Sequence, residues 1–448
     1  MNRIWVFILL FFSILVFSAA TETVTLTLEE AVQRALDQSL ALKKSTIDLT
    51  QSEYSARRLW AEIFPSFSLS AGFVFLPSTP LFTEPGFSYN NDALSYNLNF
   101  ALSLSLNPSM SSSMKRIELA YRSQLLSYES ASRQLEIQVI KRFLGLITVK
   151  ENLSHLTERL ELAENKLNND RIAWRNGLLS ELSWLNSQLS TETARYNLAY
   201  AQGTYQNTLD EFLSQLGIDA GTDIVLQGTI ELAPVLYDPE LLILEYLPKR
   251  PDIVIQRQTI ERLELSKNQT SLTSRFPTLV LSTQLRGTPE TGGGLGASLT
   301  DNLSGSLTLN IPIDSWIPGT RQNQTIRIAS AEVEKARLDL LDTETSAKNQ
   351  IRSLTFNLKN TWENLSIARL RVEIAERTLE ATNVGFRNGL LEFQELEDRR
   401  DDLSDARQRL LLEELSYQSL LLDLAAALNV EWKTLTRPGA NEVSGSLP

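Results

Sequence analysis

Two long stretches of the chain carry a heptad pattern of apolar residues and contain no proline. They cover residues 109–233 and 319–437. Proline costs about 3 kcal/mol inside a helix, and a sustained heptad indicates helices that pack along their length as in a coiled coil. We therefore predict one very long helix in each stretch. The heptad positions are Val139, Leu146, Leu153, Leu160 and Leu167, and then Ile351, Leu358, Leu365, Val372 and Leu379.

Each predicted helix ends at the same turn sequence, Arg-Asn-Gly-Leu-Leu, and a second periodic stretch follows it. Glycine directly after a helix supplies the left-handed backbone conformation that stops the helix and reverses the chain. The sequence therefore predicts two antiparallel helical hairpins. They are expected at 112–216, with its tip at 175–180, and at 319–429, with its tip at 387–392.

Before each hairpin the apolar pattern changes from a helical period to strict alternation. Apolar residues occupy every second position from Leu94 to Leu106, and mainly Ser and Asn stand between them. Such alternation predicts a strand with one apolar and one polar face. Strands are expected at about 66–76, 94–107, 278–286 and 303–312, joined in pairs by loops.

The two halves of the chain are related by an internal repeat with an offset of 212 residues. The Phe-Pro pair at 64–65 recurs at 276–277, and the turn at 175–179 recurs identically at 387–391. Landmarks far apart in the chain that share one offset indicate duplication. We expect a first repeat at 21–236, a second repeat at 237–435 and a flexible tail at 436–448.

The N-terminus is typical of a secretory signal peptide, expected at 1–20. Arg3 precedes an apolar run from Ile4 to Phe17, and small residues follow that run. The run is shorter than the roughly 20 apolar residues of a membrane-spanning helix. The alternative is an anchor that is not cleaved.

Composition narrows the chemistry that side chains can perform. The 448 residues include no cysteine, one histidine and an acidic excess that gives a formal charge of −12. These counts exclude disulfides, Cys-based metal or redox sites and a lipidated N-terminal cysteine, and they argue against nucleic-acid binding. His155 has no second histidine to join it in a metal or nucleophilic site. We therefore expect a non-enzyme with no catalytic residues, metal or cofactor.

Two environments fit the alternating strands. They could be half-buried on a soluble core, or they could be outer-membrane strands with one face toward lipid and the other toward a lumen. The chain offers no globular domain for the strands to cover, which favours the membrane. Four strands are too few to close a barrel, and open sheet edges are not tolerated in lipid. The barrel is therefore expected to be shared between subunits.

Several motifs resemble the TolC-type outer-membrane efflux family. They are Thr-Leu-Glu-Glu-Ala at 27–31, Arg-Pro-Asp-Ile at 250–253, Asn-Ile-Pro-Ile at 310–313, Phe-Pro before each first strand and the tip sequence. The likeness covers nearly all of the mature chain. It implies a mainly α fold with a small β part, in which a homotrimer forms a twelve-stranded outer-membrane barrel continued by a long periplasmic helical barrel.

The resemblance also implies a function. Such a protein is the exit duct of a tripartite export system in a Gram-negative-type bacterium. It would sit in outer-membrane lipid and conduct substrates passively from a periplasmic adaptor and an inner-membrane transporter to the exterior. In the family, acidic residues six and nine positions after the second tip glycine constrict the pore. Those positions are Glu395 and Asp398 in this chain.

The spacing of acidic residues supports a pore-facing stripe independently of the resemblance. Glu395, Asp398, Asp402 and Asp405 step by three, four and three residues, so they share one helix face. The alternative is a solvated outer face. At the tips, Gly177, Leu178 and Leu179 and their counterparts Gly389, Leu390 and Leu391 are expected to form adaptor-docking surfaces, with local packing between the hairpin arms as the alternative.

Two other function classes compete with the channel. An exported coiled-coil spacer or adhesin would explain the heptads but not the four amphipathic strands. A carboxylate-based hydrolase would need a concave site, for which the sequence offers no globular domain.

Overall fold

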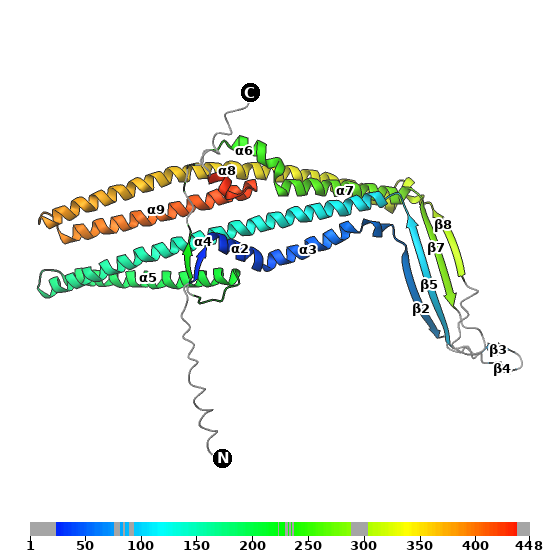
Figure 1. The fold of residues 1–448 in the computed structure, drawn as a ribbon, viewed down its shortest axis with the longest axis horizontal. Helices are drawn as coiled ribbons and strands as arrows, with labels where there is room; N and C mark the ends of the chain where they lie inside the picture. The colour runs from blue at the N-terminus through cyan, green and yellow to red at the C-terminus, as the bar shows by residue number, and fades with distance from the viewer. Residues whose placement is uncertain are drawn as a thin grey trace, which may run out of the picture. The chain divides into compact units, whose positions relative to one another are not determined.

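The computed structural model describes residues 24–75, 81–83, 86–88, 94–222, 224–228, 232, 234, 237–287 and 303–436. The expected signal peptide and all but the first residue of the expected tail lie outside these ranges. The fold is mostly helical with a small sheet part, which confirms the predicted fold class (Figure 1). Among the described residues, no helix combines the length and the apolarity needed to cross a membrane.

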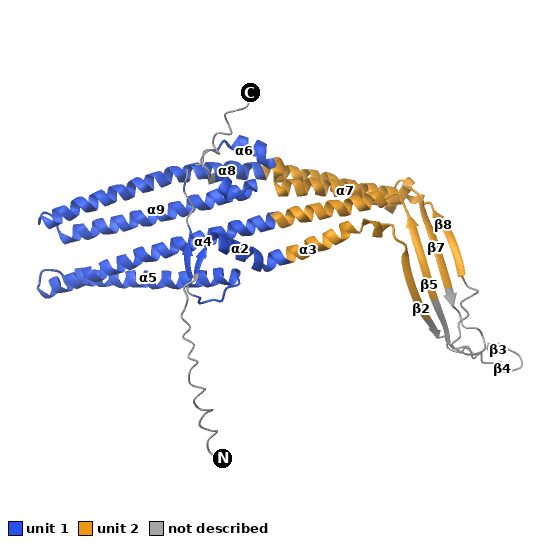
Figure 2. Cartoon of the chain, viewed as in Figure 1, with its two compact units in different colours: residues 1–43, 130–247, 347–448 blue, residues 44–129, 248–346 orange. Residues whose placement is uncertain are grey.

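The chain divides into two compact units (Figure 2). Unit 1 contains residues 1–43, 130–247 and 347–448, and unit 2 contains residues 44–129 and 248–346. Two long helices begin in unit 2 and end in unit 1. They are α4, Met110–Arg175, with 66 residues, and α8, Arg321–Arg387, with 67 residues.

Unit 1 holds the parts of both helical hairpins that carry the tips. Helix α5, Glu181–Gln215, returns along α4, and α9, Phe393–Leu428, returns along α8 (Figure 1). Burial follows the heptads. The heptad residues at 139, 146, 351, 358 and 365 are each at most 1% exposed, as coiled-coil seam residues should be. The α5 arm is also joined to α4 by the Thr191 hydroxyl, which donates to the Ala163 carbonyl at 3.0 Å.

A short parallel strand pair completes the core of unit 1. Strand β1, Val24–Thr27, pairs in register with β6, Ile224–Gln227. Helix α2, Leu28–Gln38, follows β1 and begins with a capping box between Thr27 and Glu30. Four-residue strands carry too few positions for a periodic signal, so the sequence analysis did not predict this pair. The fully buried residues around it include Leu26, Ala31, Phe143, Phe212 and Leu213.

Shorter helices fill out both units. In unit 1 they are α6, Pro239–Tyr246, the 3-10 helix η2, Leu247–Lys249, which ends in unit 2, and α10, Trp432–Thr436. Helix α3, Leu40–Arg57, leads from unit 1 into unit 2, where α7, Pro251–Arg275, packs beside α4 and α8. Ion pairs join α7 to both, from Glu261 to Lys115 at 2.8 Å and from Glu264 to Arg337 at 2.8 Å.

Unit 2 also holds a four-stranded antiparallel sheet in the order β2-β5-β7-β8. Strand β2 follows the 3-10 helix η1, Leu59–Glu62, and β8 is followed by η3, Asp314–Trp316. A separate two-stranded pair, β3 with β4, lies between β2 and β5 in sequence. The strand bounds are β2 Ser66–Phe75, β3 Leu81–Thr83, β4 Gly86–Ser88, β5 Leu94–Leu106, β7 Thr278–Gly287 and β8 Leu303–Asn310.

The sheet presents an apolar face that nothing in the described chain covers. Leu69 opposes Phe100, and Leu281 opposes Leu307, and these four side chains are 44% to 69% exposed. Serines occupy the other face, where the Ser282 and Ser306 hydroxyls lie 2.7 Å apart across the strand pair. Within the described sheet, β2 and β8 each have one neighbouring strand, so each has a free edge.

Candidate functional site

The two hairpin tips have the same backbone geometry. At the first, Gly177 has φ 73°, its N–H donates to the Trp174 carbonyl at 2.9 Å, and the Leu178 N–H donates to the Ala173 carbonyl at 2.8 Å. At the second, Gly389 has φ 74° with the two corresponding bonds, each 2.9 Å long. This is the Schellman motif, in which a left-handed residue ends a helix and satisfies its last carbonyls. The identical sequences thus make identical turns.

The two leucines of each tip differ in exposure. Leu178 and Leu390 are 80% and 77% exposed, although both belong to turns held in fixed conformations. Leu179 and Leu391 are half-buried, and a Cβ on Gly385 would lie 2.7 Å from the Leu391 side chain. The second leucine of the second tip therefore packs on the hairpin arm, whereas the first leucine of each tip is free for contact with a partner.

Aromatic pairs brace the hairpins below the tips. Trp174 of α4 stacks on Trp184 of α5 with ring centroids 4.5 Å apart, and Phe386 of α8 lies 5.8 Å from Phe393 of α9. Offset-stacked and tilted aromatic pairs add roughly 0.5–1.5 kcal/mol beyond their burial. Each tip is consequently a rigid surface.

The first two residues of the predicted acidic stripe are exposed and carry unbalanced charge. Glu395 and Asp398 lie on the first turns of α9, and among the described residues neither forms an ion pair. The Asp398 carboxylate accepts a hydrogen bond from the Gln394 amide at 2.7 Å. These two carboxylates can therefore attract a cation from solution.

The other two residues of the stripe are balanced within the chain. Asp402 accepts from the Arg399 guanidinium at 2.8 Å, and Asp405 accepts from the Arg159 guanidinium of α4 at 3.3 Å. Both carboxylates also line a groove of about 470 Å³ between α8 and α9, together with Arg371, Arg399 and Arg409. The sequence predicted a stripe without a basic member, and the fold brings arginines from neighbouring turns and helices to its lower half.

A second groove, of about 410 Å³, lies where α9 meets the first hairpin, and sequence analysis missed it. Its charged lining residues are Glu397 and Asp401 of α9 and Arg159 and Lys166 of α4. Glu397 is only 6% exposed and accepts from the Arg400 guanidinium at 2.8 Å. The repeat holds a signal that could have found this groove: 212 residues before Glu397 and Asp401 the chain has leucines.

Burial dominates the electrostatics of this groove. It raises the pKa of the Glu397 carboxyl, and the charges of Arg400 and Lys166 lower that pKa by less. Burial likewise raises the pKa of the Asp401 carboxyl, which Arg159 and Lys166 oppose and Asp405 reinforces. Removing an anion from water costs free energy, so both groups retain their protons to higher pH than ordinary carboxyls do.

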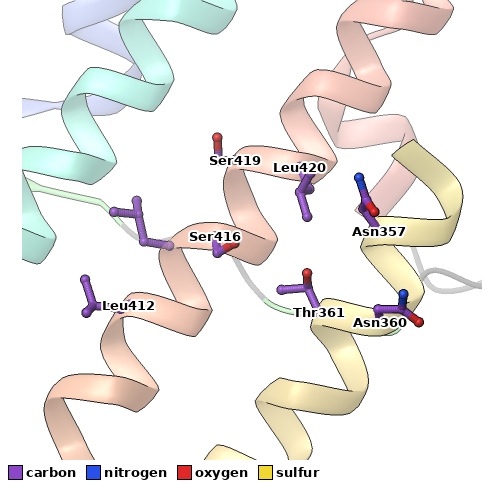
Figure 3. Close-up of a pocket in the computed structure, with 8 residues that line it drawn as sticks. Asn357, Asn360, Thr361, Leu412, Ser416, Ser419 and Leu420 are labelled. Carbon is purple, nitrogen blue, oxygen red and sulfur yellow. The ribbon is translucent and has the colours of Figure 1, made fainter. Parts of the chain in front are cut away.

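A larger cavity, of about 510 Å³, lies between α8 and α9 farther from the tip (Figure 3). Asn357, Asn360 and Thr361 of α8 and Ser416 and Ser419 of α9 provide its polar groups. These amides and hydroxyls supply no titratable group for acid-base chemistry. In the part of the chain that the structure describes, no three His, Asp or Glu side chains are grouped to hold a metal ion.

Both outer helices of the hairpin pair carry apolar stripes that the chain itself leaves open. On α5 the exposed residues step by three, four, seven and four: Leu182, Leu185, Leu189, Tyr196 and Tyr200. On α8 Ile367, Leu370 and Ile374 are each at least 50% exposed. Heptad-spaced apolar residues of this kind normally pack against another helix.

Comparisons with known proteins fit this arrangement. The family model described as outer membrane efflux protein matches residues 31–217 and 242–430, one copy in each repeat. A search of the curated proteins finds no match.

Three solved outer-membrane proteins are similar in fold. The outer membrane channel CmeC of Campylobacter jejuni has a TM-score of 0.73 at 16% identity, covering 93% of this chain and 88% of its own. The outer membrane protein VceC of Vibrio cholerae has a TM-score of 0.69 at 17% identity, and the match covers 90% of this chain and 96% of VceC. The open state of the MtrE outer membrane channel of Neisseria gonorrhoeae has a TM-score of 0.71 at 15% identity, and the match covers 92% of this chain and 91% of MtrE. Because the family model matches most of the chain in two copies, the resemblance seen in the sequence is confirmed, and the chain belongs to the outer membrane efflux protein family.

Proposed function

We propose that this protein is the outer-membrane exit duct of a tripartite export system. It conducts substrates passively from a periplasmic adaptor and an inner-membrane transporter to the exterior of a Gram-negative-type bacterium. The observation that supports this most is the combination of a four-stranded sheet with a bare apolar face and two long helical hairpins in one chain of the efflux family. A spacer or adhesin would have no use for such a sheet.

The free strand edges and the exposed apolar helix stripes support association of several copies of the chain. The free edges of β2 and β8 have backbone groups that need partners, and in lipid only a closed barrel supplies them all. The open stripes of α5 and α8 would pair when one copy stands beside the next. A homotrimer with twelve strands, as the family resemblance implies, satisfies both requirements.

The acidic residues support a cation-attracting entrance near the second tip. Among the residues that the structure describes, Glu395 and Asp398 form no ion pair, whereas Asp402 and Asp405 form ion pairs with Arg399 and Arg159. In a trimer three copies of the unpaired pair would surround one axis and concentrate negative potential there. We therefore assign the constriction chiefly to Glu395 and Asp398, with the lower two residues extending it.

The tips support docking of the adaptor. Leu178 and Leu390 are exposed on rigid turns, and an exposed apolar residue on a fixed turn gains free energy when a partner covers it. Gly177 and Gly389 set the turn geometry, and Leu179 and Leu391 pack beneath the contact surface. Both repeats present the same five-residue tip, so the adaptor would meet similar surfaces around the whole entrance.

Membrane extraction and planar-bilayer recording test the proposal together. A duct requires detergent for extraction, migrates as a trimer and conducts ions across a bilayer. A protein that high salt releases and that carries no current would overturn the duct in favour of the coiled-coil spacer.

A further inference from the structure

The internal repeat gives each helix contact of the first hairpin a counterpart in the second. The stripe of α5 at 185 and 189 corresponds, after 212 residues, to positions 397 and 401 of α9. In α5 the residues are Leu185 and Leu189, which are exposed. In α9 they are Glu397 and Asp401, which face α4 of the same chain. The same stripe is thus apolar in one repeat and acidic in the other.

The α4 surface that α9 faces differs from its α8 counterpart by one positive charge. The α4 groups at the groove are Arg159 and Lys166, and the corresponding residues of α8 are Arg371 and Thr378. We name this contact the α4–α9 seam and define it by Arg159, Lys166, Glu397, Asp401 and Asp405. It joins the two hairpins of a chain through charges, and the Arg159–Asp405 ion pair is its direct link.

Within the described ranges of the chain, the charged groups that face Glu397 and Asp401 come from two helices. From α4 these groups are Arg159 and Lys166, and from α9 they are Arg400, Asp398 and Asp405. Helix α5 forms the third wall and contributes no charged side chain to the groove lining; its lining residues are Asn186, Leu189, Ser190, Thr193, Ala194 and Asn197. Both seam acids therefore have cations nearby, yet Glu397 is almost entirely removed from water.

We propose that the α4–α9 seam is a proton-responsive contact, which holds the hairpin at 319–429 against the hairpin at 112–216 more tightly in mildly acidic than in alkaline solution. The proposal does not rest on the conduction of substrates, because both hairpins belong to one chain.

The direction follows from linkage between proton binding and closure. The Glu397 carboxyl is only 6% exposed in the closed seam, its burial raises its pKa, and separation of the helices would return it to water. The pKa of the Asp401 carboxyl is raised in the same direction, but Asp401 is already exposed and loses less on closure. The closed seam therefore binds more protons than the open one at pH values above the ordinary carboxyl range of about 4. Closure is therefore favoured at the acidic end of that window. As pH rises, the equilibrium constant for closure falls, in total by about tenfold for each unit by which the pKa of the closed form exceeds that of the open form.

Distance measurement by spin labelling can test the seam in the full-length protein. The chain has no cysteine, so labels at Glu161→Cys on α4 and Leu412→Cys on α9 are unique, and both positions are exposed. Labelled chains diluted with unlabelled chains report the distance within one chain. We expect a shorter and narrower distance distribution at about pH 5 than at about pH 8.

Substitution separates the seam from other titrating groups. Glu397→Leu with Asp401→Leu installs the residues of the first repeat, and Glu397→Gln with Asp401→Asn keeps a polar seam if the first variant folds poorly. Both pairs should abolish the pH-dependent shift. Glu395→Gln, at an exposed acid of the same helix that is not among the groups facing the seam acids, should retain it. A distance that does not change with pH in the parent chain, or a full shift in both seam variants, would overturn the proposal, whatever the bilayer currents show.

Discussion

Replacing Gly389 by alanine should loosen the second hairpin tip without disturbing its surroundings. Gly389 has φ 74°, a left-handed conformation, and a Cβ built on it meets nothing within 4 Å. The cost is therefore carried by the backbone alone. For an L-residue with a side chain that cost is roughly 1–2 kcal/mol, which raises the population of the opened turn about 5- to 30-fold.

Hydrogen exchange at the tip measures this change directly. The N–H groups of residues 389 and 390 donate to the carbonyls of Phe386 and Gly385, and opening of the turn frees both. Their protection should fall by the factor above, and Gly177→Ala at φ 73° should have the same effect on the first tip. Protection at distant amides of α8 should remain unchanged.

Asparagine should be tolerated better than alanine at this position, because its side chain stabilises the left-handed conformation locally. The chain itself supplies the precedent: Gly217, at φ 71°, ends α5, and the residue 212 positions later is Asn429, at φ 54°. Gly203→Ala inside α5 is the matched control and should stabilise its helix by about 1 kcal/mol. Equal protection in Gly389→Ala and the parent chain, or equal losses for alanine and asparagine, would refute the reasoning.

Three further variants, two double and one single, test the entrance, the docking surface and the core. Glu395→Ala with Asp398→Ala should raise single-channel conductance and weaken block by divalent cations, and planar-bilayer recording measures both. The reason is that the attraction between a carboxylate and a cation charge 4 Å away in water is worth on the order of 1 kcal/mol, and each substitution removes one such attraction. Leu178→Asp with Leu390→Asp should abolish export while leaving the oligomer intact, since charge replaces the apolar docking contact; export assays and native electrophoresis check this. Phe143→Ala should lower the free energy of unfolding by about 3–5 kcal/mol, as measured by denaturation in detergent, because its ring is fully buried against Phe212.

Matched controls accompany each of these changes. Asp402→Ala with Asp405→Ala removes carboxylates that arginines already balance, so it should change the currents less. Leu244→Asp, at a residue of α6 that is 78% exposed, should leave export intact. Thr355→Ala, at the half-buried counterpart of Phe143 in the second repeat, should cost much less stability. Currents that do not distinguish the two acidic pairs, or full export with both tip leucines replaced, would contradict the assignments.

Local patterns in the sequence carried most of the architecture. Heptads such as that of Leu358 and Leu365, and the alternation from Leu94 to Leu106, each describe one element and its own buried face, and such faces need no knowledge of distant residues. The tip turns were equally predictable, because Asn-Gly at the end of a helix determines a left-handed stop from a few residues. The short β1·β6 pair was not, since its four-residue strands gain stability only from pairing across the chain.

Some features of the candidate site were likewise set by local sequence, and others by the tertiary structure. The sequence by itself determined that Glu395, Asp398, Asp402 and Asp405 share one face of α9, because helical periodicity is a local property. The Arg399–Asp402 pair is also local, since three residues separate its members. Only the tertiary structure decided that Asp405 has an ion-pair partner, because the cation that reaches it comes from Arg159, 246 residues away in the chain. The burial of Glu397 was decided in the same way. The free energy of a charge depends on the groups and the water that surround it in space, and folding sets those surroundings.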